Sequence, residues 1–304
     1  MVRSILLLIL TLLAGCSSDL RPFEYGCIRM GTRARVVVYA SDAARAEAAV
    51  AAAWARMAEV EAVLSDWQED GPVARLRDAA PGTWVEVDPM LDEALGLAQA
   101  VATATGGAFD PACGRMTAAW REARRDGGFP ADWAAWTTQH GPGASRLTRR
   151  PGAIRFDTPV PWLDFGGIGK GYAADQALAT LRGHGLAAAM VEIGGELALG
   201  DPPPGGRGWR VTGAAAAGGG DSGMVLSRCG VATSGGGAQS LTSRGQIASH
   251  VMDPRTGRWL GRHDDITVVA PSAAEADALA SAGCVLGREA LQRRVRARTD
   301  VRVY

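Results

Sequence analysis

Segments of strand length and segments of helix length follow one another along this 304-residue chain without strict alternation. Residues 35–39 and 188–193 are apolar enough for strands. Ser41-Asp42 can cap a helix, and the Ala-rich stretch that follows carries apolar side chains at helical spacing. Strict alternation would predict a parallel sheet, so the mixed order favours an α+β fold. With 47% hydrophobic residues, the chain can bury the core of one large domain or of two closely packed lobes.

Local signals place further elements along the chain. Helices are expected at three more places: from about Leu91 to Gly106, from Lys170 towards Gly183, and after Ser272. The last has the clearest start, because Glu275 stands at capping-box distance from Ser272. Further strands are expected at residues 209–212, 224–227, 247–252 and 266–270. Residues 124–150 are rich in Gly, Pro and Trp, and we expect them to be irregular.

The N-terminus has the pattern of a targeting segment. Arg3 precedes a short apolar run over residues 5–13, and small residues lead to Cys16. The run is shorter than the about 20 apolar residues that a membrane-spanning helix needs. It resembles a bacterial lipoprotein signal, which implies cleavage before Cys16 and lipid attachment to its thiol. We therefore expect a signal peptide over residues 1–15, a lipid-anchored tether over 16–27, one domain over 28–304, and an extracytoplasmic, periplasm-facing location at a bacterial membrane.

The 32 basic and 32 acidic side chains balance, so the composition gives no sign of the basic surface that nucleic-acid binding requires. Only one basic side chain is a lysine, Lys170, and it lies among four glycines in the segment 164–172. The ammonium group of lysine is a compact point charge on a flexible stem, unlike the planar guanidinium of arginine. Glycines let the backbone approach phosphate-bearing ligands closely.

This glycine-rich segment does not match the two common nucleotide-binding patterns. A Walker A loop would need Gly in place of Asp164 and Ser or Thr in place of Gly171, and the Rossmann pattern fails at Tyr172. A P-loop kinase and a nicotinamide dehydrogenase are therefore both disfavoured.

Two further places in the sequence carry residues that could bind a metal ion or act as a general base. Asp277 and Ser281 stand four residues apart on the last expected helix, so their oxygens share one face. With a nearby backbone carbonyl they suit Mg²⁺, although an Asp early in a helix also simply opposes the helix dipole. His250 ends an expected strand, where an imidazole serves either as a general base or as a hydrogen-bonded structural group.

Seven short motifs follow one another in the chain: Met30-Gly31-Thr32, Gly106 to Pro111, Asp164 to Tyr172, Ile193 to Glu196, Ala232 to Gly235, His250 to Gly257, and Ala276 to Leu279. Each is modest, but their ordered set is specific. Together with Ser281 they cover nearly the whole expected domain. In this order the chain resembles the FAD:protein FMN transferase (ApbE) family.

The resemblance implies two α/β lobes with the FAD site between them. It also implies an Mg²⁺-dependent transferase that splits the pyrophosphate of FAD, links FMN to a Thr or Ser hydroxyl of an acceptor protein and releases AMP. Carried over by position, the FAD contacts are Met30, Trp67, Ala108, Phe109, Asp110, Asp164, Lys170 and Val251. The metal ligands are Asp277, the Ser281 hydroxyl and the Gly167 carbonyl.

In the same resemblance His250 is the base for the incoming hydroxyl, and Lys170 supplies positive charge at the phosphates. The implied acceptor is a flavinylated subunit such as that of a Na⁺-pumping NADH:quinone reductase or an Rnf-type complex. Loops at Gly71-Pro72 and Gly236-Gly237 depart from the family pattern. An Mg²⁺-dependent FAD pyrophosphatase that gives FMN and AMP therefore stays open as an alternative. A third reading, from another class, is a lipid-tethered FAD-binding protein without catalysis, and the presence of Lys170, His250 and Asp277 argues against it.

Overall fold

The computed structural model describes residues 20–128, 147–157, 162–212, 223–235, 240–243, 246–261 and 263–304. The expected signal peptide, Cys16 and the Gly236-Gly237 loop lie outside the described residues. Within the described ranges, no helix has both the length and the apolar character needed to cross a membrane.

The centre of the molecule is a seven-stranded sheet in which every neighbouring pair of strands is antiparallel. In spatial order its strands are β1 (Arg21–Arg29), β2 (Thr32–Ala40), β6 (Ala189–Ile193), β7 (Glu196–Leu199), β10 (Cys229–Ser234), β15 (Ile266–Ala270) and β16 (Arg302–Val303). Helices and an antiparallel sheet in one unit confirm the expected α+β class.

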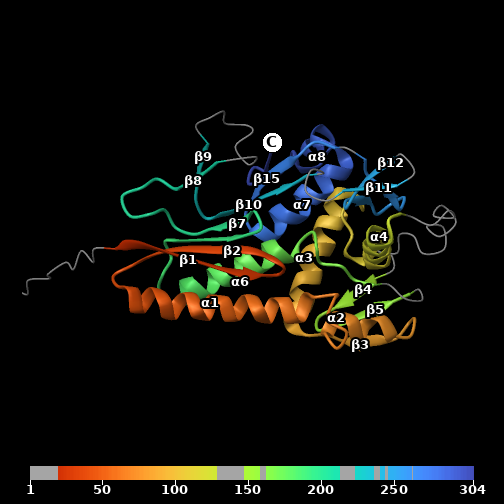
Figure 1. Ribbon diagram of the computed structural model, residues 1–304, viewed down its shortest axis with the longest axis horizontal. Coiled ribbons are helices and arrows are strands. Elements are labelled where there is room, and N and C mark those ends of the chain that lie inside the picture. Colours follow the sequence, from red (N-terminus) through yellow and green to blue (C-terminus); the bar gives the residue numbers. More distant parts are fainter. Residues whose placement is uncertain are drawn as a thin grey trace, which may run out of the picture.

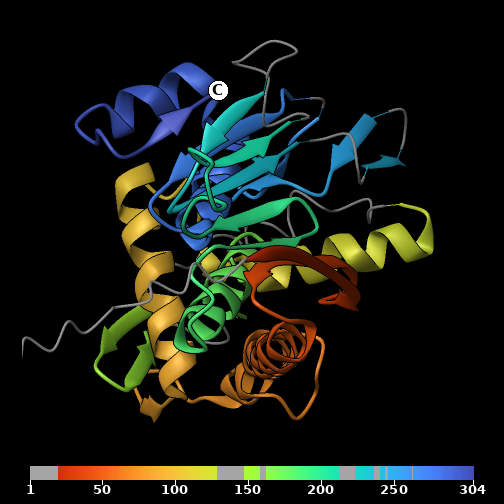
Figure 2. The ribbon, with the colours of Figure 1, turned by 90° about the vertical axis from the view of Figure 1, so that its left-hand side faces the viewer.

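Helices cover one face of this sheet (Figure 1). They are α1 (Ala43–Leu64), α6 (Gly169–Gly183) and α7 (Ala273–Leu286), with α3 (Pro89–Thr105) and α8 (Arg288–Val295) beside α7. Figure 2 views α1 nearly end-on, below the sheet. Alternate residues of β2, such as Val36 and Val38, point towards these helices and are fully buried, so the main core lies between sheet and helices.

Smaller elements surround this core. They are α2 (Pro72–Arg75), α4 (Gly114–Asp126), the 3₁₀ turns Leu76–Asp78 and Pro111–Cys113, and the strands β3 (Trp84–Glu86), β4 (Leu147–Arg150), β5 (Ala153–Phe156), β8 (Trp209–Val211), β9 (Met224–Leu226), β11 (Ser240–Ser243), β12 (Gln246–Ser249), β13 (Met252–Asp253) and β14 (Arg258–Trp259). The β8–β9 pair supplies Trp209 and Leu226 to a second apolar cluster with Val231 and Val269 of the main sheet.

Several local predictions are confirmed. Asp42 caps α1 by accepting the amide of Arg45, and Ser272 caps α7 by accepting the amide of Glu275. Gly106 ends α3 in a left-handed conformation with φ of 63°.

Other expectations differ from the structure. Residues 21–27 are expected in a tether but belong to β1, because they pair with residues 34–40 of β2. The expected strand 247–252 is divided between β12 and β13. The irregular stretch expected over residues 124–150 contains the end of α4 and the strand β4, while residues 129–146 lie outside the described part.

Candidate functional site

The site is built where the N-terminal turns of α6 and α7 meet. A methyl group added at Gly171 would lie 2.2 Å from the carbonyl oxygen of Ala273, and one added at Gly230 would lie 2.1 Å from the amide nitrogen of Ala273. Only glycine permits so close an approach of two backbones. Asp175, one turn further along α6, accepts the amides of Ala273 and Ala274 at 2.9 Å. The start of α7 is thereby fixed against α6.

This junction brings Lys170 together with two buried carboxylates. Its Nζ donates to Glu196 Oε1 at 2.5 Å and lies 4.0 Å from Asp277 Oδ2. Asp277 Oδ2 also accepts the amide of Gly171 at 3.2 Å. The second carboxylate oxygen of Glu196, Oε2, is buried and has no hydrogen-bond partner among the described residues. The group therefore holds more negative than positive charge in a site largely shielded from water.

Burial governs how these groups titrate. It raises the pKa of Glu196 to about 7, with further repulsion from Asp277 and an opposing attraction from Lys170. Burial also raises the pKa of Asp277, although Lys170 and the Gly171 amide oppose that shift. For Lys170, burial acts to lower the pKa, but the charges of Asp277 and Glu196 outweigh it and the pKa is raised.

The other predicted metal ligands lie beside this group. A methyl group added at Gly167 would lie 3.0 Å from the Ser281 hydroxyl oxygen and 3.2 Å from a ring carbon of Phe109. Gly167 precedes Lys170 by three residues, and Ser281 follows Asp277 by one helical turn. A methyl group added at Gly169 would lie 3.5 Å from the terminal carbon of Met30, which turns between β1 and β2 with φ of 50°.

The predicted FAD contacts Trp67 and Asp164 form a neighbouring group around Arg121 of α4. The guanidinium of Arg121 donates to Asp66 at 2.6 Å and to Asp164 at 3.0 Å. Its central carbon lies 4.2 Å from the centre of the Trp67 ring. Asp164 also accepts the amide of Gly166, so this group is joined to the loop that carries Gly167 and Lys170.

The remaining predicted residues are placed as follows. Ala108 and Asp110 are buried, and Asp110 accepts the amide of Ala112 at 2.8 Å. The ring of His250 lies 6.4 Å from that of Trp120, the residue before Arg121. The carbonyl of Val251 accepts the amide of Leu260 at 2.9 Å. His250 and Val251 therefore lie on the α4 side of the site.

Sequence reasoning did not assign a role to Glu196 or to Arg121. The sequence could have drawn attention to Glu196, because it ends the motif Ile193 to Glu196. Its pairing with Lys170 appears only in the folded structure. No sequence pattern points to Arg121, because its carboxylate partners are 55 and 43 residues away in the chain.

The residues at the α6–α7 junction suit a divalent cation that is shared with an anionic ligand. They do not form a site in which several side chains alone surround the metal. Among the described residues, no group of three His, Cys, Asp or Glu side chains is arranged to hold a metal ion. One buried carboxylate, one hydroxyl and one glycine carbonyl are instead the sparse oxygen donors typical of Mg²⁺ sites that leave room for water and phosphate.

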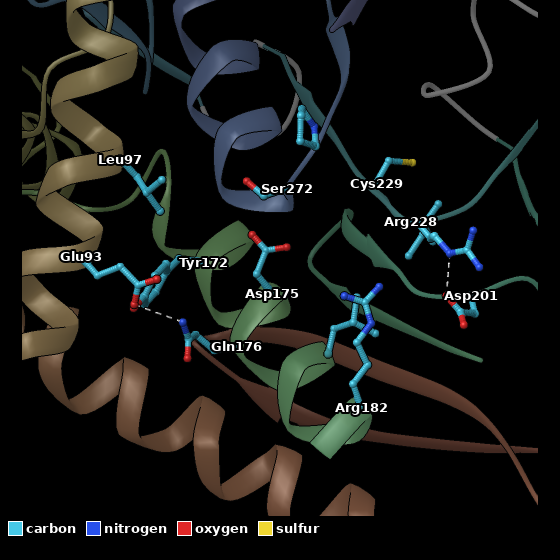
Figure 3. A pocket seen from close by; sticks show the side chains of 13 residues that line it. Glu93, Leu97, Tyr172, Asp175, Gln176, Arg182, Asp201, Arg228, Cys229 and Ser272 are labelled. Atoms are coloured by element: carbon cyan, nitrogen blue, oxygen red, sulfur yellow. Dashed lines mark hydrogen bonds and ion pairs between the residues drawn. The ribbon is translucent and has the colours of Figure 1, made fainter. Parts of the chain in front are cut away.

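A cavity of about 630 Å³ lies on another side of α6 (Figure 3). Its walls include Glu93, Tyr172, Asp175 and Arg182, and Asp175 points towards the start of α7. Burial raises the pKa of Asp175 to about 6, against the effect of the two amides that it accepts. Among the residues described, the lining includes none of the predicted site residues, so the candidate site is separate from this cavity.

Comparisons with known proteins agree with the motif order. The sequence profile of the ApbE family matches residues 30–304. The FAD:protein FMN transferase of Klebsiella pneumoniae is 28% identical over 97% of this chain and 89% of its own length. That of Treponema pallidum is 30% identical over 94% of this chain and 85% of its own.

A solved structure is similar over nearly the whole length. The apo crystal structure of the Pseudomonas stutzeri flavinyl transferase ApbE covers 93% of this chain and 90% of its own, with a TM-score of 0.80 and 24% identity. At that identity the similarity establishes a common fold.

Proposed function

The chain belongs to the ApbE family, and we propose that it transfers FMN from FAD to a Thr or Ser hydroxyl of an acceptor protein. The phosphorus of the FMN half forms a new bond to the acceptor oxygen, its bond to the bridging oxygen breaks, and AMP leaves. The observation that carries this proposal is the meeting of Lys170, Asp277, Ser281 and Gly167 at the α6–α7 junction.

The donors at this junction fit Mg²⁺. Gly167 has no side chain to crowd the Ser281 hydroxyl. Asp277 is a buried carboxylate whose ion-pair partner within the described part of the chain is Lys170, 4.0 Å away. We therefore assign Asp277, the Ser281 hydroxyl and the Gly167 carbonyl as the residues that would hold the ion. When bound, Mg²⁺ would neutralise negative charge on the pyrophosphate.

Lys170 is assigned to the phosphates of FAD. Phosphoryl transfer depends mainly on positioning and on charge stabilisation, and the raised pKa of Lys170 keeps its ammonium charged at neutral pH. Its half-buried position beside the glycine loop suits contact with an anion. The second carboxylate, Glu196, holds the ammonium on the side of Asp277.

The other assignments follow the motif order. His250 is the base that removes the proton of the acceptor hydroxyl. Met30, Trp67, Ala108, Phe109, Asp110, Asp164 and Val251, together with Lys170, are the FAD contacts. The largely exposed ring of Trp67 is available for stacking, which supports its place in this set.

The location and the acceptor rest on the sequence alone. We propose cleavage before Cys16 and lipid attachment there, which would tether the enzyme on the outer side of a bacterial membrane. The proposed acceptor is a flavinylated subunit of a Na⁺-pumping NADH:quinone reductase or an Rnf-type complex, which would be reached from that side.

Asp277→Asn tests the metal assignment. We expect AMP release from FAD in the presence of Mg²⁺ and acceptor to fall by more than about a hundredfold, because a charged ligand is lost. FAD affinity measured without Mg²⁺ should change little. Asp201→Asn is a matched control, since Asp201 pairs with Arg228 beside the separate cavity.

The same assay separates the alternatives. Unchanged Mg²⁺ dependence in Asp277→Asn would rule out the metal assignment. With wild-type protein, free FMN and AMP without labelled acceptor would indicate a pyrophosphatase, and intact FAD would indicate a binding protein.

A further inference from the structure

Arg121 joins three segments that are distant in the chain. It projects from α4 and reaches the loop after α1 through Asp66 and the loop before α6 through Asp164. Its terminal nitrogen also donates to the Thr117 hydroxyl at 3.1 Å, and its Nε donates to the Thr117 carbonyl at 3.2 Å. The guanidinium is therefore fixed in one orientation by its own helix.

Arg121 also covers one side of an exposed aromatic ring. Trp67 is 70% exposed, yet the guanidinium carbon of Arg121 lies 4.2 Å from the ring centre. The main chain of this loop is held separately, because Arg77 donates to the carbonyl of Asp66. Because this large ring is already held on one side and exposed elsewhere, a flat ligand group can stack on it with little further loss of side-chain conformational entropy.

The charge of Arg121 keeps two carboxylates together. Asp66 and Asp164 both accept from the same nitrogen of Arg121, so this cation offsets their mutual repulsion at hydrogen-bond distance. The charge of Arg77 adds a smaller attraction at Asp66. Burial is the main cause that raises the pKa of Asp66, and the charge of Asp164 adds to it. Loss of Arg121 would leave two largely buried carboxylates facing each other without the cation that both of them contact.

Asp164 connects Arg121 to the loop that carries Gly167 and Lys170. Its Oδ2 is held by Arg121, while its Oδ1 accepts the Gly166 amide at 2.6 Å. Gly167 and Lys170 follow in the same loop and at the start of α6.

We propose that Arg121 is a positioning residue of the FAD site, which fixes Trp67 as a stacking surface for a flat ring of FAD and sets the loop of Asp164 beneath the pyrophosphate. This inference rests on the proposed function. FAD carries two flat rings, the isoalloxazine of its FMN half and the adenine of its AMP half, and either has the chemistry for stacking.

The test is FAD binding without Mg²⁺ or acceptor, followed by flavin fluorescence. Arg121→Met should raise the Kd for FAD by about tenfold, the size expected for a lost stacking support and an unpaired carboxylate. Arg121→Lys keeps the charge but not the flat guanidinium, and it should recover part of the affinity. Arg125→Met, on an exposed position of the same helix, is the matched control and should bind FAD like the wild type.

A double-mutant cycle distinguishes positioning from general damage to the fold. In a Trp67→Leu background, Arg121→Met should cost clearly less FAD affinity than in the wild type, because the supported ring is already absent. Titration with FMN and with AMP then identifies the ring, since only the ligand that carries the stacked ring should lose affinity in Arg121→Met.

An unchanged Kd for FAD in folded Arg121→Met would overturn the inference, and so would an equal loss in the Trp67→Leu background. Wild-type protein that binds FAD but never labels an acceptor would instead overturn the proposed function, while the loss of affinity in Arg121→Met would persist.

Discussion

At the scale of single residues, the site depends on one ammonium between two buried carboxylates. Lys170 is the only lysine of the chain, and it faces Glu196 and Asp277 at the start of α6. Removing one partner of a buried ion pair leaves the other partner uncompensated, which costs more than the pair contributes. The stability of the protein should therefore report directly on this arrangement.

We expect Lys170→Met to lower the free energy of unfolding by about 3 kcal/mol at pH 8, and by less at pH 6. Glu196 already has a pKa of about 7 because of burial, and loss of Lys170 removes an interaction that lowers it. A carboxyl group whose pKa is higher in the folded than in the unfolded protein stabilises the fold at pH values below its pKa in the unfolded state. This contribution is lost as the pH rises through its pKa in the folded state.

Denaturant unfolding of both proteins at the two pH values measures this difference. Lys170→Arg, which keeps the positive charge, serves as the control and should show little change between the two pH values. A destabilisation by Lys170→Met that is the same at pH 6 and pH 8 would mean that Glu196 does not titrate as described.

At the scale of elements, the contact between α6 and α7 decides whether Lys170 and Asp277 meet. The contact needs Gly171, because any side chain there would strike the backbone at Ala273. It also needs Asp175, which holds the first amides of α7.

Gly171→Ala should lower the melting temperature markedly and reduce Mg²⁺-dependent turnover, because the two helices must separate. Overpacking of this kind costs about 1–3 kcal/mol or more where the obstacle is backbone. Gly183→Ala, at the other end of α6, meets nothing within 4 Å and should leave stability unchanged or slightly increased. Equal melting temperatures for the two variants would contradict the close packing.

Elements with local signals could be predicted from the sequence, and elements that depend on distant partners could not. The caps at Asp42 and Ser272 need only a few neighbouring residues, so their helices were placed well. Residues 21–27 were expected in a tether because their strand is defined by pairing with β2, which no local pattern reveals. The break at His250 between β12 and β13 likewise depends on the tertiary structure.

At the scale of the whole molecule, the fold brings residues from four regions of the chain to one site. Met30 comes from the first hairpin, Phe109 from the turn after α3, Gly167 and Lys170 from the start of α6, and Ser281 from α7. The order of motifs predicted this set, because it carries the family pattern.

Arg121 could not be predicted from the sequence, since its ion pairs and its stacking on Trp67 arise only when α4 folds against two loops.

Transfer of FMN can be measured as the mass of an acceptor subunit after incubation with this protein, FAD and Mg²⁺. We expect the acceptor to gain the mass of one FMN less one water, located on a single Thr or Ser, with an equal amount of AMP released. An acceptor of unchanged mass, whether FAD stays intact or is split to free FMN and AMP, would mean that this protein is not an FMN transferase for that acceptor and would overturn the proposed function.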